Sequence, residues 1–468
     1  MNRRKTWLIT ALLALFAWTD AAAETLINND VLRLTFDDRG NLQSAMACFP
    51  ACTGANARVQ QFGDASVIAL NAPGAGQWVR EESSSNTHFE LRFRSASGGV
   101  KTWRVPRKGY LIELEQSGVS SISIQSGASF RPREAAGFGN WLEQSRYVLL
   151  HSGEARQVGL DDTDTTGATI DQWVGFRNRY WALMASPPSE ISARLLTAEN
   201  NPDARVEIEQ PGGNWSFYLG PVEPRILSNA APELSNLLFA GLWFWLRWIC
   251  FAMFHLLTGI HSVIPSWGLA VMAMSLTVNI LMMPLSRFAD RLQQQVNETE
   301  ARLAPELQRI KKGFKGEEQA AKILALYKTE RVHPLYSLKS LMGVAVVIPV
   351  FIGAFDMLAE NIHLLNAGFL WISDLSRPDD LFRLPFTLPF FGNELNLLPF
   401  LMTGLSVVAS GLHKPLALNA ELRKKQVRNM LLLAVAFFVL FYTFPAGMVL
   451  YWTTNNLISV TKSLWARR

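Results

Sequence analysis

Residues 339–359 read KSLMGVAVVIPVFIGAFDMLA, and the charged side chains of this run are confined to positions 339 and 356. A helix of about 20 predominantly apolar residues crosses the roughly 30 Å hydrocarbon core of a bilayer. Four similar stretches occupy 266–286, 395–412, 429–445 and 446–465. We therefore predict a membrane α-helical bundle of five spans over residues 266–468; the alternative is a set of buried helices in a large soluble protein.

Basic residues alternate between the loops of this bundle. The loop 287–338 carries ten Lys and Arg residues and 413–428 carries five, whereas 360–394 carries two. Because cytoplasmic loops are enriched in Lys and Arg, we predict that the two basic loops and the C-terminus are cytoplasmic. The net charge of +5 then orients the chain rather than forming a nucleic-acid surface.

The N-terminus resembles a targeting segment. Residues 1–23 combine a basic start, a 12-residue apolar stretch at 7–18 and the small residues Ala21, Ala22 and Ala23. This pattern is typical of a secretory signal peptide, with an uncleaved anchor as the alternative. In either case we predict that the chain is exported from Glu24 onward.

Residues 24–230 show an apolar period of two. Leu32, Leu34 and Phe36 alternate with polar neighbours, and the same pattern recurs at 89–93 and 215–219. Strands of this kind bury one face and expose the other. We predict an exported all-β sandwich in the periplasm with a spacer or partner-docking role; sugar binding is the alternative.

Two cysteines in this exported domain, Cys48 and Cys52, are candidates for a disulfide. Metal binding is the less favoured reading, because no His lies near them in sequence. The chain also lacks the G-x-x-x-x-G-K-[ST], G-x-G-x-x-G and H-E-x-x-H motifs. We therefore predict no enzymatic activity, no catalytic residues, no metal and no small-molecule cofactor.

Residues 236–262 form an apolar segment whose length permits a crossing. A crossing there would place the basic loop 287–338 outside the cell, against the charge distribution. We predict an amphipathic helix in the outer interface, with Arg247 and His255 reaching water.

The cytoplasmic loop 287–334 predicts a helical hairpin. Apolar residues recur at steps of three and four from 292 to 310 and again from 320 to 327, and glycines at 313 and 316 interrupt them. We expect the two stripes to bury each other. Its exposed basic side chains suit anionic lipid headgroups, ribosomal RNA or an acidic protein, unless they form a merely solvated face: Arg302, Arg309, Lys311, Lys312 and Lys315.

Polar residues within the spans predict a hydrophilic groove. Such groups are costly at membrane depth and usually face a bundle interior or a wet cavity. Interhelical hydrogen bonds are the alternative role for them. The candidate groove residues are Ser275, Thr277, Asn279, Thr403, Ser406, Thr453, Thr454, Asn455, Asn456 and Ser459.

Several local motifs resemble the bacterial YidC membrane protein insertases. They are MPLS at 283–286, LAPELQ at 303–308, ALYKTERVHPL at 325–335, LWISDLS at 370–376 and FPAGMVLY at 444–451. The resemblance implies an insertase or chaperone in the bacterial inner membrane that gives client helices a groove open to cytoplasm and lipid. It also implies nascent membrane proteins, the Sec translocon and ribosomes as partners.

The chain departs from the family in three places. Asn279 aligns with the family's groove arginine, residues 336–339 replace a G-G-C-x-P continuation, and a cleavable signal replaces an uncut first helix. These departures suggest a specialised paralogue. A non-inserting assembly or scaffold factor is the alternative function, and a small-molecule transporter is a less favoured third.

Overall fold

The computed structural model describes residues 24–54, 57–63, 66–72, 77–131, 135–159, 168–198, 201–209, 212–333, 335–336, 338–412 and 420–465. The predicted signal peptide, 1–23, lies outside the described residues. The chain divides into two compact units. Of the described residues, unit 1 takes those within Met1–Arg131, Ser145–Pro221 and Arg225–Ser235, and unit 2 takes those within Pro132–Gln144, Val222–Pro224 and Asn236–Arg468.

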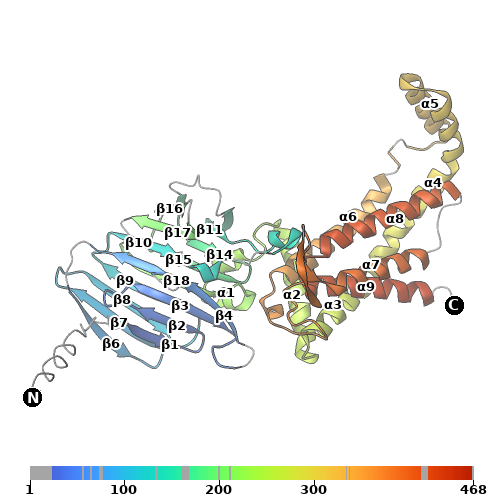
Figure 1. The fold of residues 1–468 in the computed structure, drawn as a ribbon. Helices are drawn as coiled ribbons and strands as arrows, with labels where there is room; N and C mark the ends of the chain where they lie inside the picture. The colour runs from blue at the N-terminus through green and yellow to red at the C-terminus, as the bar shows by residue number, and fades with distance from the viewer. Residues whose placement is uncertain are drawn as a thin grey trace, which may run out of the picture. The chain divides into compact units, whose positions relative to one another are not determined.

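Unit 1 is a sandwich of two antiparallel sheets (Figure 1). Within the described ranges each sheet has nine strands, in the orders β1-β2-β3-β5-β10-β17-β16-β13, with β4 beside β3, and β12-β11-β14-β15-β18-β9-β8-β7-β6. The first sheet comprises β1 (Thr25–Asn28), β2 (Leu32–Phe36), β3 (Leu42–Phe49), β4 (Arg58–Gly63), β5 (Ile68–Asn71), β10 (Ser121–Gln125), β13 (Ala168–Ile170), β16 (Ile191–Ala198) and β17 (Asn201–Glu209). The second comprises β6 (Trp78–Ser84), β7 (His88–Ser95), β8 (Val100–Pro106), β9 (Leu111–Ser117), β11 (Arg146–His151), β12 (Glu154–Gly159), β14 (Trp173–Arg177), β15 (Trp181–Ser186) and β18 (Gly213–Pro221). The prediction of a β-sandwich is confirmed.

Alternating apolar residues build the core between the sheets. Trp103 of β8 pairs in register with Leu114 of β9, which pairs with Trp215 of β18, and all three side chains are buried. Phe36 of the opposite sheet lies 5.3 Å from Trp103 between ring centroids. Burial of such large aromatic side chains contributes much of the stability of a sandwich.

The turn between β2 and β3 shows how closely the two sheets approach. Gly40 has a positive φ of 76°, and a Cβ at this position would lie 2.8 Å from the ring of Phe93. Its carbonyl oxygen accepts a hydrogen bond from Trp103 Nε1 at 2.9 Å. A glycine is therefore needed both for the backbone conformation and for the space.

A disulfide joins Cys48, near the end of β3, to Cys52 in the following loop. Three short helices complete the surroundings of the sandwich: η1 (Ala128–Phe130), α1 (Pro224–Ala230) and η3 (Pro232–Leu237).

Unit 2 is helical, with one small hairpin of strands. Its longer helices are α2 (Phe244–Val263), α3 (Trp267–Leu281), α4 (Met283–Gly313), α5 (Gly316–Thr329), α6 (Leu338–Ala359), α7 (Leu397–Leu412), α8 (Ala420–Phe441) and α9 (Ala446–Trp465). The shorter elements are η2 (Gly137–Trp141), η4 (Ile362–Leu364), β19 (Phe382–Leu388) and β20 (Gly392–Leu395). η2 lies between β10 and β11 in sequence, so part of the predicted domain 24–230 belongs structurally to the helical unit.

Among the described residues, one helix is long and apolar enough by itself to cross a membrane, and that helix is α2. α3 and α4 pass the same test as a pair bent by 56°, at a break followed by Pro284. Shorter apolar helices occur at Val347–Ala359, Leu397–Leu412 and Val427–Phe441. The helices match the predicted stretches in position, but the number of five spans stays a prediction.

α2 buries one stripe and exposes the other. Leu246, Cys250 and Leu257 are buried, whereas Trp248 and His255 are exposed. Arg247 is half-buried, and its Nη2 donates to Asn236 Oδ1 at 3.3 Å. This amphipathic division is what an interfacial helix requires.

The predicted hairpin forms, but its two helices do not bury each other equally. α5 and the adjoining end of α4 extend away from the other helices of unit 2 (Figure 1). Val296 and Leu303 of α4 are buried, whereas α5 has no buried residue. Ala320 is exposed and Ile323 half-buried. The expectation of mutual burial is therefore wrong for α5, because α4 lies mainly against α6 instead.

Candidate functional site

α9 packs between α3 and α7, and consecutive polar residues on it face different neighbours. Successive residues of a helix are separated by about 100° around its axis. Asn455 therefore contacts α3 while Asn456 contacts α7. The residues predicted to form one groove are divided between these two sides of α9.

On the α3 side, Asn455 accepts two hydrogen bonds with its Oδ1 atom. One comes from Ser275 Oγ at 2.9 Å, and the other comes from Asn279 Nδ2. Ser275 is fully buried, whereas Asn279 and Asn455 are half-buried. Ser275 and Asn279 lie one turn apart, so a single amide oxygen can satisfy both.

Lys462 extends this polar row toward the end of α9. Its exposed Nζ lies 3.4 Å from Asn279 Oδ1. No local sequence pattern predicts this contact, because 183 residues separate the two positions. We use the name polar seam for Ser275, Asn279, Asn455 and Lys462 together with the α7 contacts of Asn456.

On the α7 side, Asn456 Nδ2 donates to Ser406 Oγ at 2.6 Å and to the Met402 carbonyl at 3.0 Å. Thr403 Oγ1 is buried and has no hydrogen-bond partner within the described part of the chain. Buried polar groups are usually satisfied by protein or by ordered water. This hydroxyl is therefore an unusual feature of α7, next to the seam.

The remaining candidate residues make more local contacts. Thr277, Thr453 and Thr454 donate to the carbonyls of Ala273, Val449 and Leu450, each one turn earlier on the same helix. Such bonds satisfy a hydroxyl within a helix and make it compatible with an apolar environment. Ser459 is half-buried.

These contacts favour interhelical hydrogen bonding as one role of the polar residues. The interhelical contacts do not bury all of these polar side chains, because Asn279, Asn455 and Asn456 remain half-buried. The seam thus both joins the helices and keeps amide groups partly accessible at its surface.

The basic residues predicted for the hairpin are exposed on α4 and in the turn that follows it. They are Arg302, Arg309, Lys311, Lys312 and Lys315. Arg309 pairs with Glu306 at 2.9 Å, and Arg302 lies 3.7 Å from Glu330 of the segment after α5. Lys311 and Lys312 occupy the last turn of α4, where cations are favoured by the helix dipole.

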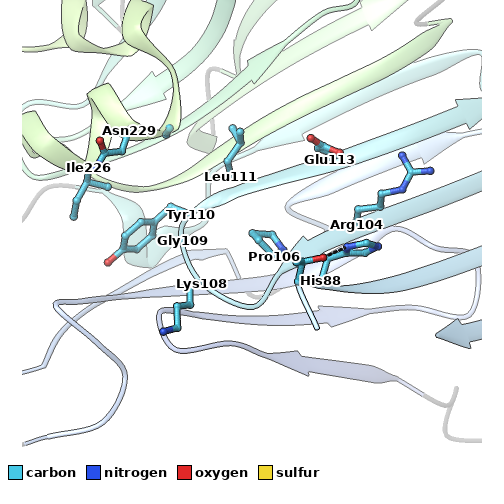
Figure 2. A pocket seen from close by; sticks show the side chains of 12 residues that line it. His88, Arg104, Pro106, Lys108, Gly109, Tyr110, Leu111, Glu113, Ile226 and Asn229 are labelled. Carbon is cyan, nitrogen blue, oxygen red and sulfur yellow. Dashed lines mark hydrogen bonds between the residues drawn. The ribbon is translucent and has the colours of Figure 1, made fainter. Parts of the chain in front are cut away.

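Unit 1 contains a separate open cavity of about 640 Å³ beside β8 and α1. Figure 2 shows His88, Arg104 and Glu113 on its strand side, with Ile226 and Asn229 on the helix. The Arg104 guanidinium lies 2.9 Å from Glu115 and 3.6 Å from Glu90. Its charge is thus largely compensated. In the same cavity the Thr87 hydroxyl lies 2.9 Å from His88 Nδ1, a contact that occupies this ring nitrogen locally.

The elements described above define a class of protein: a large β-sandwich joined to a unit of apolar helices that carries a polar seam. The family described as "60Kd inner membrane protein" matches residues 259–468. The resemblance to the YidC membrane protein insertases is confirmed: the chain is similar to them over most of its length.

Two relatives illustrate the extent of the similarity. Membrane protein insertase YidC of Cupriavidus pinatubonensis is 27% identical over 393 residues, covering 78% of this chain and 65% of that protein. YidC of Shewanella halifaxensis is 29% identical over 330 residues, covering 68% and 55%. The chain therefore spans slightly less than two thirds of the length of the Cupriavidus protein.

A solved structure titled as an active YidC insertase with its first transmembrane domain resolved is also similar. It shares 14% identity and a TM-score of 0.38, covering 94% of this chain and 92% of that one.

Proposed function

We propose that this protein is a membrane protein insertase and chaperone of the bacterial inner membrane. The observation that carries the proposal is the half-buried polar seam between α3, α7 and α9, in a chain similar to YidC over 78% of its length. Its clients are nascent membrane proteins, and it requires no small-molecule cofactor.

The physical basis is the cost of moving polar groups through hydrocarbon. A charged side chain at the bilayer centre costs about 3 kcal/mol or more, and an unsatisfied backbone group costs several kcal/mol. Partly accessible amides such as Asn279 and Asn456 offer hydrogen bonds along this path. They lower the barrier for the polar flank of a client helix without nucleotide hydrolysis.

The proposed topology has five spans, with the β-sandwich in the periplasm and the C-terminus in the cytoplasm. The alternation of basic loops supports it. The α4–α5 hairpin then lies in the cytoplasm, where its basic residues suit the ribosome or anionic lipid. The Sec translocon is a further proposed partner.

Depletion of the resident YidC followed by complementation with this chain tests the proposal. We expect rescue of the insertion of at least one small membrane protein, monitored by protease protection of its translocated tail. A panel of small clients, including products of neighbouring genes, guards against a narrow client range. If none is rescued although the chain is stably present in the membrane, the insertase function is wrong.

The alternative is an assembly or scaffold factor that has lost insertase activity, and Asn279 favours it. An arginine at this position, Asn279→Arg, distinguishes the two functions. Gain of client rescue indicates a weakened insertase, whereas assembly activity that is independent of residue 279 indicates a scaffold.

A further inference from the structure

Two short elements of unit 2 expose a set of large apolar side chains. η2 exposes Phe138 and Trp141, and the β19–β20 hairpin exposes the others, each residue being between 38% and 58% accessible. We call this set the aromatic collar, and it comprises Phe138, Trp141, Phe382, Phe386, Leu388 and Phe390.

The hairpin in the collar is amphipathic. Apolar residues alternate along β19 at Phe382, Leu384, Phe386 and Leu388, and the register with β20 shifts between Arg383 and Leu388. Phe382 pairs with Leu395 of β20, and Arg383, on the other face, pairs with Glu394. The Arg383 guanidinium is 3.7 Å from Glu394 and 3.2 Å from Asp380, so these charges gather on the side away from Phe382 and Leu395.

The collar is held firmly against the helices. The Gly139 N–H donates to Thr443 Oγ1 at 3.0 Å, and a Cβ on Gly139 would lie 2.4 Å from the Thr443 carbonyl oxygen. Phe138 meets Phe390 edge to face at 5.0 Å between ring centroids. The exposed rings are therefore presented by an ordered surface.

Exposure of these apolar side chains to water is unfavourable. Contiguous exposed apolar patches mark interaction sites. The hairpin also continues directly into α7, whose Phe400, Leu401 and Val408 are exposed and apolar. The apolar surface of the collar thus runs on into the surface that a membrane helix presents to lipid.

We infer that the aromatic collar lies in the membrane interface, with the apolar face of the hairpin against the acyl chains and Arg383 toward water. Aromatic side chains are enriched at this depth, where an apolar body and a polar environment meet. The β19–β20 hairpin is then an anchor in contact with lipid rather than a purely aqueous loop. The inference depends on membrane residence and not on insertase activity.

Spin labels on neighbouring residues of β19 test this placement. Cys250→Ser removes the free thiol, and Phe386→Cys or Thr387→Cys then places a nitroxide on the apolar or the opposite face. Val408→Cys on α7 is the lipid reference and Ser97→Cys in unit 1 is the aqueous reference. Collision rates with oxygen and with a nickel chelate are measured in liposomes of zwitterionic and anionic phospholipids.

We expect the label at 386 to show an oxygen-to-nickel ratio several times that at Ser97 and close to that at Val408. The label at 387 should resemble that at Ser97. Nickel access at 386 equal to that at Ser97 would overturn the inference, as would shielding from both reagents, which indicates a protein partner or a second copy. Nickel access at Val408 would reject membrane residence itself.

Discussion

The Oδ1 atom of Asn279 on α3 lies 3.4 Å from the Nζ atom of Lys462 on α9. Position 279 is where the resemblance to YidC places a groove arginine. Asn279 itself is uncharged, and the positive charge next to it belongs to Lys462 on a different helix. Under the proposed insertase function, this exposed ammonium attracts the anionic parts of a client.

Replacement of Lys462 tests the importance of this charge. We expect Lys462→Glu to slow insertion of a client with an acidic translocated tail by roughly five- to tenfold, equivalent to about 1–1.4 kcal/mol in the barrier. Charge reversal replaces an attraction by a repulsion. Protease protection of the tail, measured over time in proteoliposomes, gives the rate.

Lys462→Arg is the matched control, because it keeps the charge, and it should retain the rate. A client with a neutral tail should be inserted equally by all three proteins. Equal slowing of acidic and neutral clients would show that Lys462 acts through folding of the bundle rather than through its charge.

Asn455 should stabilise the contact between α3 and α9. Asn455→Leu removes the acceptor that Ser275 and Asn279 share, although each keeps a backbone acceptor, and we expect a loss of about 1 kcal/mol, as for other interhelical hydrogen bonds in membranes. Thermal unfolding in detergent measures the change. Thr461→Val is the control, since this exposed hydroxyl donates only to Leu457 of its own helix among the contacts described, and its effect should be within 0.5 kcal/mol, roughly.

Local pattern predicted the elements of this fold well. The alternation of Leu32, Leu34 and Phe36 identified a strand with one buried face, and all three side chains are buried. The glycines at 313 and 316 marked the break between α4 and α5. In both cases the information lies within a few neighbouring residues, where period and turn chemistry operate.

Contacts between distant segments were beyond such patterns. Gly139 and Thr443 are 304 positions apart, so no periodicity places η2 in the helical unit. The division of the candidate groove also follows from packing, because Asn455 and Asn456 are adjacent in sequence but meet α3 and α7 respectively. In α5 the sequence pattern predicted an apolar stripe, but no other helix buries it, and α5 has no buried residue.

Lys101 of β8 should make the stability of unit 1 depend on pH. Its side chain is almost fully buried, and burial lowers its pKa from 10.5 to about 8. Between these values the unfolded chain binds more protons than the folded one, so the free energy of unfolding rises with pH. We expect a contribution of up to about 1.4 kcal/mol per pH unit in this window.

Lys101→Met should abolish this contribution. The comparison uses urea unfolding of the two proteins at several pH values between 8 and 10.5, followed by proteolysis of unit 1. If the free energy of unfolding changed equally with pH in the two proteins between pH 8 and 10.5, Lys101 would not be the source of the pH dependence. Below pH 8 the free energy of unfolding of the two proteins should change with pH in the same way, because Lys101 is then protonated in both folded and unfolded states.

Asp379 should determine where α7 begins. Its buried Oδ2 accepts hydrogen bonds from the N–H groups of Leu397 and Leu398, at 2.8 and 3.0 Å, and from Trp371 Nε1 at 3.1 Å. The first N–H groups of a helix have no partner within it, and a carboxylate near them also interacts favourably with the helix dipole. Asp379→Ala should therefore destabilise the bundle by about 2 kcal/mol.

The local consequence separates this role from a general loss of stability. Amide hydrogen exchange at residues 397–400 should accelerate more than exchange in α9, because the first turn of α7 opens without its acceptor. Asp380→Asn is the neighbouring control: Asp380 pairs with the exposed Arg383, and loss of that pair should cost at most about 0.5 kcal/mol. Unchanged exchange at 397–400 in Asp379→Ala would show that the helix start is fixed by other contacts.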